Sequence, residues 1–109
     1  MFDTLVALLQ LIPNVQFAEY EWKTRPAGNF GTVQIDFEVD DDNGDDGHQD
    51  RAFEGSVDLF TNGKAMMIVA AVETVLENVC SGSWYLNSEQ YERDTKLVHR
   101  EFVFQIEAR

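Results

Sequence analysis

The chain has 109 residues, of which 44% are hydrophobic and 12% aromatic, enough apolar material for one domain with one core. Its 20 acidic residues against 8 basic ones give a formal net charge of −12. Such a charge repels nucleic acids and anionic membranes, so it disfavours ordinary DNA or RNA binding and favours basic partners, cations or a surface that repels polyanions.

The N-terminal part predicts a short helix and then a strand. Asp3 can cap a helix over residues 4–12, in which apolar residues recur at helical spacing, and Pro13 ends it. Residues 14–22 (NVQFAEYEW) alternate loosely and are rich in strand formers. Residues 23–29 hold a proline and a glycine and predict a loop.

The strongest strand pattern lies on either side of an acidic run. Residues 30–40 and 51–60 alternate between apolar and polar side chains, and the Gly- and Asp-rich segment between them predicts an antiparallel hairpin. Its loop is the acidic run, about residues 40–50. The residues expected to face the core are Val33, Ile35, Phe37, Val39, Phe53, Gly55, Val57 and Leu59. The residues expected on the opposite face are Gln34, Asp36, Glu38, Glu54, Ser56 and Asp58.

The C-terminal half predicts a second helix and two further strands. Asn62 can cap a helix over residues 64–80 with a broad apolar stripe, and Gly82 follows its end. Residues 84–92 and 96–107 predict two strands.

The expected order of elements is therefore α-β-β-β-α-β-β in a single domain, residues 1–109. One-sided strands predict an α+β fold: a mainly antiparallel sheet of about five strands with two helices on one face. The first helix can pack beside the second or against a neighbouring subunit.

The acidic run raises the question of a metal site. Its carboxylates can bind a hard cation through oxygen, and His48 can add an imidazole nitrogen. An EF-hand loop starting at Asp42 would place Gly44 at the third position and Phe53 at the twelfth, where a bidentate glutamate is needed. The segment also joins strands rather than helices. We therefore expect a solvated loop with at most loose cation binding, no specific metal site and no cofactor.

Catalytic patterns are not evident either. A polar loop does not bury a carboxylate as acid–base catalysis requires. His99 falls on the outward side of a strand, and Cys80, the one cysteine, ends an apolar helix where an inert buried thiol is the common case. We expect a protein that is not an enzyme.

Four residues are candidates for a protein–protein interface: Trp22, Trp84, Tyr85 and Arg100. Arg100 lies on the apolar side of the last strand's alternation. If it is buried it needs a partner, for example in a neighbouring subunit. The alternative is that the strand end reaches water.

The layout resembles the tail terminator, or tail completion (minor tail), proteins of long-tailed bacteriophages and prophages. The segments that carry the resemblance are TLVALLQLIP, VQFAEYEW, TVQIDFEV, GSVDLFTNGKAMMIVAAVETVLENV and REFVFQIE. They span nearly the whole chain, although the density of the acidic run matches no pattern of the family.

The resemblance implies a structural virion protein that forms a homo-oligomeric ring, usually a hexamer. Such a ring caps the tail tube, joins it to the head, and lets DNA pass without specific binding. The implied partners are further copies of the chain, the tail tube and head-completion proteins, with no membrane. The implied location is the tail or neck of the virion, and the host cytoplasm during assembly.

Acidic side chains can line the opening of such a ring, because they repel passing phosphates, or they can reach a neighbouring ring. The candidates for the lining or a partner surface are Asp36, Glu38, Asp40, Asp41, Asp42, Asp45, Asp46, Glu54 and Asp58.

Two alternatives stay open. A small acidic DNA-mimic or inhibitor protein would bind a basic partner, but it needs carboxylates spread over a broad face at phosphate-like intervals. Another head–tail connector, or a small structural protein of a contractile apparatus, would share the fold and differ in its neighbours.

Overall fold

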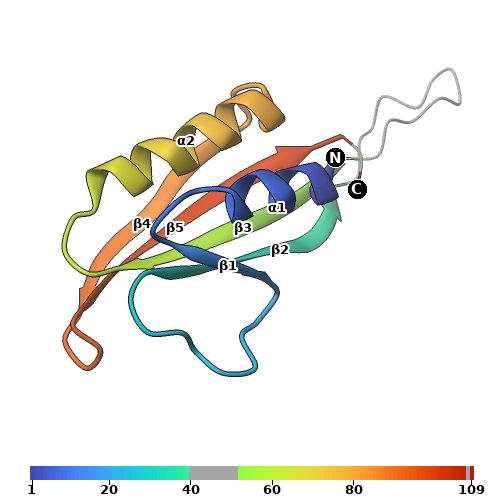
Figure 1. Cartoon of the computed structure of the whole chain (residues 1–109). Coiled ribbons are helices and arrows are strands. Elements are labelled where there is room, and N and C mark those ends of the chain that lie inside the picture. The colour runs from blue at the N-terminus through green and yellow to red at the C-terminus, as the bar shows by residue number, and fades with distance from the viewer. Residues whose placement is uncertain (40–51, 108) are drawn as a thin grey trace, which may run out of the picture.

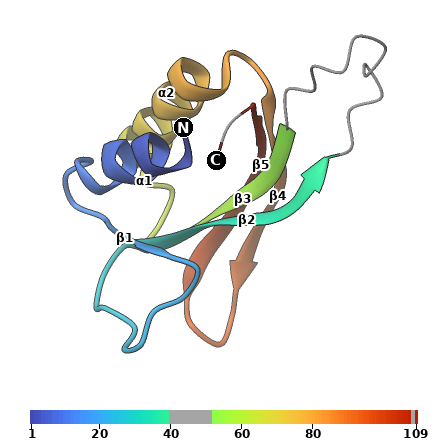
Figure 2. The ribbon, with the colours of Figure 1, turned by 90° about the vertical axis from the view of Figure 1, so that its right-hand side faces the viewer.

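The computed structural model describes residues 1–39, 52–107 and 109. In this part of the chain the elements are α1 (Phe2–Gln10), β1 (Gln16–Glu19), β2 (Phe30–Val39), β3 (Ala52–Thr61), α2 (Met66–Cys80), β4 (Trp84–Glu92) and β5 (Leu97–Ile106). The strands form one sheet, and both helices cover the same face of it (Figures 1 and 2). The expected α+β fold with a five-stranded sheet and two helices is confirmed.

The sheet is mixed, whereas the sequence predicted a mainly antiparallel one. The strand order is β1-β2-β3-β5-β4. β1 pairs with β2 in parallel, and the other three pairings are antiparallel. The parallel pair arises because residues 20–29 carry the chain back along the sheet, so that Phe30 starts β2 beside Gln16 at the start of β1.

The core lies between the helices and the sheet. Periodic apolar residues place one stripe of α2 on the sheet, as predicted, and α1 packs beside α2 and β1 rather than away from them. Burial of each such side chain contributes about 1.5–3 kcal/mol. The apolar residues buried completely are Leu5, Leu9, Val33, Val57, Leu59, Val72, Leu76, Phe102 and Phe104.

The helix starts differ from the expected ones. α1 begins at Phe2, so Asp3 lies in its first turn instead of capping it, where its charge still favours the helix dipole. α2 begins at Met66 after Ala65, which has a left-handed backbone (φ 47°) and no side-chain cap. Asn62 is therefore not the cap of α2.

A β-bulge in β2 changes which side chains reach the core. Ile35 pairs with Gly55 and Phe37 with Glu54, so Asp36 is an extra residue between two successive pairs. One extra residue inverts the alternation beyond it. The expectation that Phe37 faces the core is therefore wrong: it shares with Glu54 the sheet face opposite the helices, which we call the outer face, and is 54% exposed.

Candidate interaction surface on the outer face

The outer face carries many of the chain's described acidic side chains. Glu54 and Asp58 of β3 lie on it, as the sequence predicted, with Glu101 opposite Asp58 on β5. Asp36 lies at the bulge. Glu38 does not join them, because beyond the bulge it pairs with Phe53 on the helix-facing register. Ser56, expected to face solvent, is on this face but is buried by its neighbours.

Asp58 and His99 form an ion-pair cluster with Glu92. Nε2 of His99 lies 2.8 Å from Oδ1 of Asp58, and Nδ1 lies 3.5 Å from Oε2 of Glu92. Burial raises the pKa of Asp58 above its usual 3.8; the hydrogen bond and charge of His99 lower it in part, and the charges of Glu101 and Asp36 raise it further. The outer face thus concentrates carboxylates here, with the ring of His99 between two of them.

A stack of rings crosses the same end of the outer face. The guanidinium of Arg25 lies 4.8 Å from the ring centre of Phe30. Phe30 stacks on Phe60 with centroids 4.8 Å apart, and Phe60 stacks on His99 at 4.2 Å. Strand alternation did not predict this stack, and its one signal in the sequence is that Phe30 and Phe60 occupy polar positions of their strands' alternation. It holds residues 20–29 against β2.

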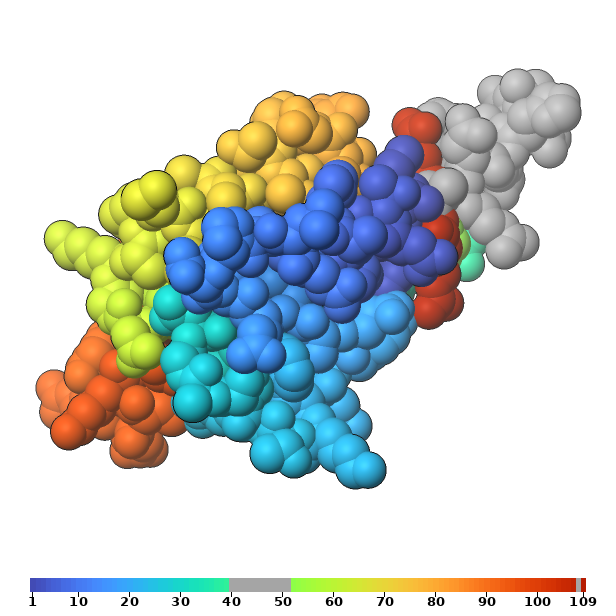
Figure 3. All heavy atoms as spheres, viewed as in Figure 1, coloured from blue at the N-terminus to red at the C-terminus, as the bar shows by residue number. Residues whose placement is uncertain are grey.

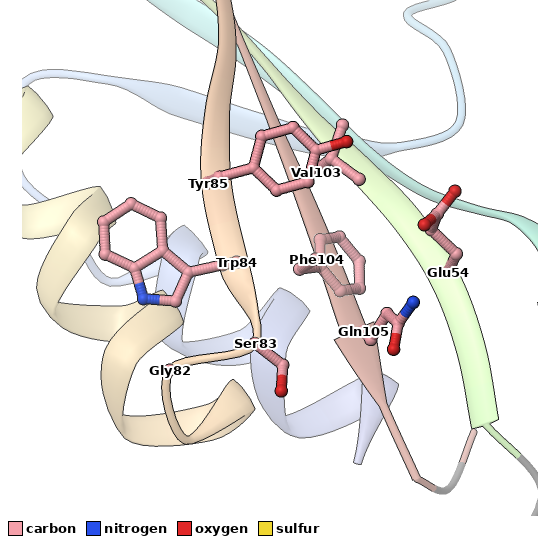
Figure 4. A pocket seen from close by; sticks show the side chains of 8 residues that line it. All are labelled: Glu54, Gly82, Ser83, Trp84, Tyr85, Val103, Phe104 and Gln105. Atoms are coloured by element: carbon pink, nitrogen blue, oxygen red, sulfur yellow. The ribbon is translucent and has the colours of Figure 1, made fainter.

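A shallow pocket of about 290 Å³ opens at the other end of the outer face, where β4 begins. Tyr85, Glu54 and Gln105 extend from three strands toward this face, whereas Trp84 points the opposite way, toward α2 (Figure 4). The residues that line it are Glu54, Gly82, Ser83, Trp84, Tyr85, Val103, Phe104 and Gln105. An aromatic ring and a carboxylate beside one concave surface suit a cationic or amphipathic side chain of a partner.

The structure does not bring the four predicted interface residues together. Trp22 donates its indole N–H to the carbonyl of Gly31 (2.9 Å), and Trp84 packs on the core while its indole N–H bonds Glu77 (3.0 Å). Tyr85 is 54% exposed.

Arg100 is 3% exposed, so its strand does not carry it into water, and it has partners within the chain. Its Nε donates to Oε2 of Glu89 (2.7 Å) and its Nη1 to Oγ1 of Thr61 (3.2 Å).

The remaining candidate groups offer little chemistry. Asp40, Asp41, Asp42, Asp45, Asp46 and His48 lie outside the described residues. Within residues 1–39 and 52–107, no three His, Cys, Asp or Glu side chains are arranged to hold a metal ion. Burial raises the pKa of the Cys80 thiol to about 11, so it is protonated at neutral pH. Neither described helix is long and apolar enough to cross a membrane.

Figure 3 shows the side of the molecule on which the two helices lie. The α1 and α2 side chains lie side by side above β1 and the residues that follow it, and they cover most of the sheet from this side. The outer face is therefore the broad side of the sheet that no described helix covers.

Comparison with known proteins shows a shared fold and no family. The sequence matches no protein-family model, and a search of curated proteins found no relative. A solved structure of the "virion of native gene transfer agent (GTA) particle" contains a chain with a TM-score of 0.50 and 14% sequence identity. The match covers 93% of this chain and 81% of that chain. At this identity, the likeness is one of fold.

Proposed function

We propose that the protein is a structural component of a virion, of the tail-terminator type. It forms a homo-oligomeric ring that caps a tail tube and joins it to the head. The observation that carries the proposal is the fold likeness, over 93% of the chain, to a chain of a virion particle. The sequence resemblance to tail terminators supports the finer assignment.

The sheet has two unlike edges, which suits a ring. β1 and β4 end the sheet on opposite sides, and each pairs with one strand in the described part of the chain. A contact between two different surfaces is heterologous and closes into a ring when the rotation between copies allows it. In this proposal the partners are further copies of the chain, the tail tube and head-completion proteins, and the protein acts by assembly, not catalysis.

The end of the outer face around Asp58 and Glu101, away from the pocket beside Glu54, suits an opening through which DNA passes. Burial and the negative charges of Glu101 and Asp36 raise the pKa of Asp58, as expected where carboxylates lie close together on one face. A surface of this sign repels phosphates and lets a duplex slide without being held. The location that follows is the tail or neck of the virion, with assembly in the host cytoplasm.

The DNA-mimic alternative receives less support. The outer-face carboxylates are interrupted by exposed rings, since Phe37 and Tyr85 are each 54% exposed. A mimic of a duplex needs charge without such apolar interruptions, whereas interfaces between proteins are rich in aromatic residues.

Electron microscopy of the purified, concentrated chain in negative stain tests the proposal. We expect closed rings of about six copies with a central opening. The mimic would instead be favoured by two results together: micrographs that show single copies alone, and tight binding of a basic DNA-binding protein domain used as a probe.

A further inference from the structure

Glu54 is a carboxylate without a partner in the described part of the chain. It lies on the outer face in the middle of the sheet, paired across strands with Phe37 on one side and Gln105 on the other. Neither a hydrogen bond nor an ion pair joins it to any other described residue. It also forms one side of the 290 Å³ pocket (Figure 4). A half-buried acid in a concave site gains most from a cation that a partner supplies.

Two exposed rings flank Glu54 in strand order. Phe37 lies on β2, beside Glu54, and Tyr85 lies on β4, beyond β5. Each is 54% exposed, and Phe37 reaches this face because of the bulge at Asp36. A carboxylate near aromatic faces suits a guanidinium or ammonium group, which can form an ion pair and a cation–π contact together.

The chain itself offers a matching cationic segment, residues 20–29. This loop follows β1 at the edge of the sheet opposite β4 (Figure 1). It holds Lys23 and Arg25, both exposed, against one acid, Glu21, so it has two cations and one anion in a chain of net charge −12. Copies of so acidic a chain repel one another unless a cationic segment meets an acidic one.

The loop is already ordered, which lowers the entropy cost of docking it. Trp22 is bonded to the carbonyl of Gly31, and Arg25 is stacked on Phe30. At its end, the Asn29 side chain donates to the carbonyl of Asn14 (3.2 Å) and accepts from the backbone N–H of Asn62 (2.8 Å). A preorganised segment loses less freedom on binding than a disordered one.

We propose that the loop 20–29 of one copy docks on the outer face of the next, with Lys23 and Arg25 directed at Glu54 between Phe37 and Tyr85. The inference rests on the ring assembly proposed above and names the contact that builds it. Because the loop and the site are different surfaces of the chain, a contact from each copy to the next is heterologous, as a ring requires.

Charge exchange between the two surfaces tests the contact, with molar mass measured by light scattering after size exclusion. Glu54→Arg alone, or Lys23→Glu with Arg25→Glu, should raise the dissociation constant of the assembly by roughly 100-fold. The variant that combines all three substitutions should recover most of the wild-type mass. Asp94→Arg, the same charge change in the exposed β4–β5 turn, is the matched control and should leave the mass unchanged.

Tyr85→Ala keeps the net charge and should also weaken assembly, so it tests the contact even if a charge variant fails to fold. Circular dichroism melts establish whether each variant is folded. If the wild-type chain assembles and the Glu54→Arg and Tyr85→Ala variants form assemblies of the same molar mass, this contact is overturned and the proposed ring stands. A wild-type chain that stays monomeric at every concentration would overturn both.

Discussion

Arg100 shows how a charged residue is kept inside this sheet. Its side chain is 4% exposed, on the helix-facing side of β5, and Glu89 on the neighbouring strand β4 supplies the opposite charge. The alternation of the last strand predicted the side on which Arg100 lies. It could not predict the partner, because that depends on the register of β4 against β5, which local sequence does not set.

Glu89→Ala should lower the free energy of unfolding by about 2 kcal/mol, because it leaves the Arg100 guanidinium buried without its counter-charge. The loss is smaller than for a fully buried pair, since Glu89 itself is 54% exposed. Glu89→Gln retains an acceptor and should lose less. Urea unfolding measures both, with the exposed Gln90→Ala on the same strand as control. A Glu89→Ala variant as stable as that control would contradict the assigned role.

Asp58 should make stability depend on pH. Burial, partly offset by His99, raises its pKa above 3.8, so the folded protein holds this proton more tightly than the unfolded chain. The free energy of unfolding therefore loses a contribution as pH rises from 3.8 through the folded-state pKa. Asp58→Asn removes that titration.

We expect Asp58→Asn to gain stability relative to the wild type as pH rises through this window. Urea unfolding of both proteins at a series of acidic pH values measures the difference, and carbon NMR of the Asp58 carboxyl gives its midpoint directly. A midpoint below 3.8, or a difference that shrinks with rising pH, would contradict the sign.

At the scale of elements, the bulge in β2 decides which residues belong to the core. Val33 lies before it and is completely buried, whereas Phe37 lies after it and is 54% exposed. Val33→Ala should cost about 2 kcal/mol of unfolding free energy. Phe37→Ala should change it by no more than about 0.5 kcal/mol, although it removes the larger side chain.

Thermal or urea unfolding of the Val33→Ala and Phe37→Ala variants distinguishes a bulged β2 from a regular one. If β2 alternated without interruption, Phe37 would be a core residue, and Phe37→Ala would be the more damaging substitution. That order of stabilities would contradict the bulge.

The regular parts of the fold were predictable from the sequence, and the exceptions have local causes. The apolar stripe of α2 predicted its buried residues, among them Ile68, Val72 and Leu76, because a helix on a sheet buries one face. The direction of β1 was not predictable, because so short a strand pairs in either direction and the path of residues 20–29 decides. The bulge was hidden because the sequence alternation continues through Asp36.

The outer face was predictable in part. Strand alternation placed Glu54 and Asp58 on it correctly. It did not reveal that Asp58 meets His99, that Phe30 and Phe60 stack, or that Tyr85 shares a pocket with Glu54. The first and last of these relations join β3 to strands that follow it in the chain only after α2, so they depend on the order of strands in the sheet. The Phe30–Phe60 stack depends on the register of the β2–β3 hairpin.

At the scale of the whole molecule, charge and topology support the same account. A net charge of −12 opposes contact between copies, so assembly needs the few exposed cations to meet acidic surface on a neighbour. The cationic loop 20–29 follows the edge strand β1, whereas the outer-face site centres on β3 in the middle of the sheet. β1 and β4 leave both edges of the sheet open in the described part of the chain. These features favour a heterologous assembly over a symmetric pair.

The most direct test of this account is the mass of the wild-type chain in solution, measured by analytical ultracentrifugation over a wide range of protein concentration. The account predicts conversion from a single chain to one closed species of about six copies, with no larger species at the highest concentration. A single chain at every concentration would contradict it, and so would growth without limit, because neither is a ring.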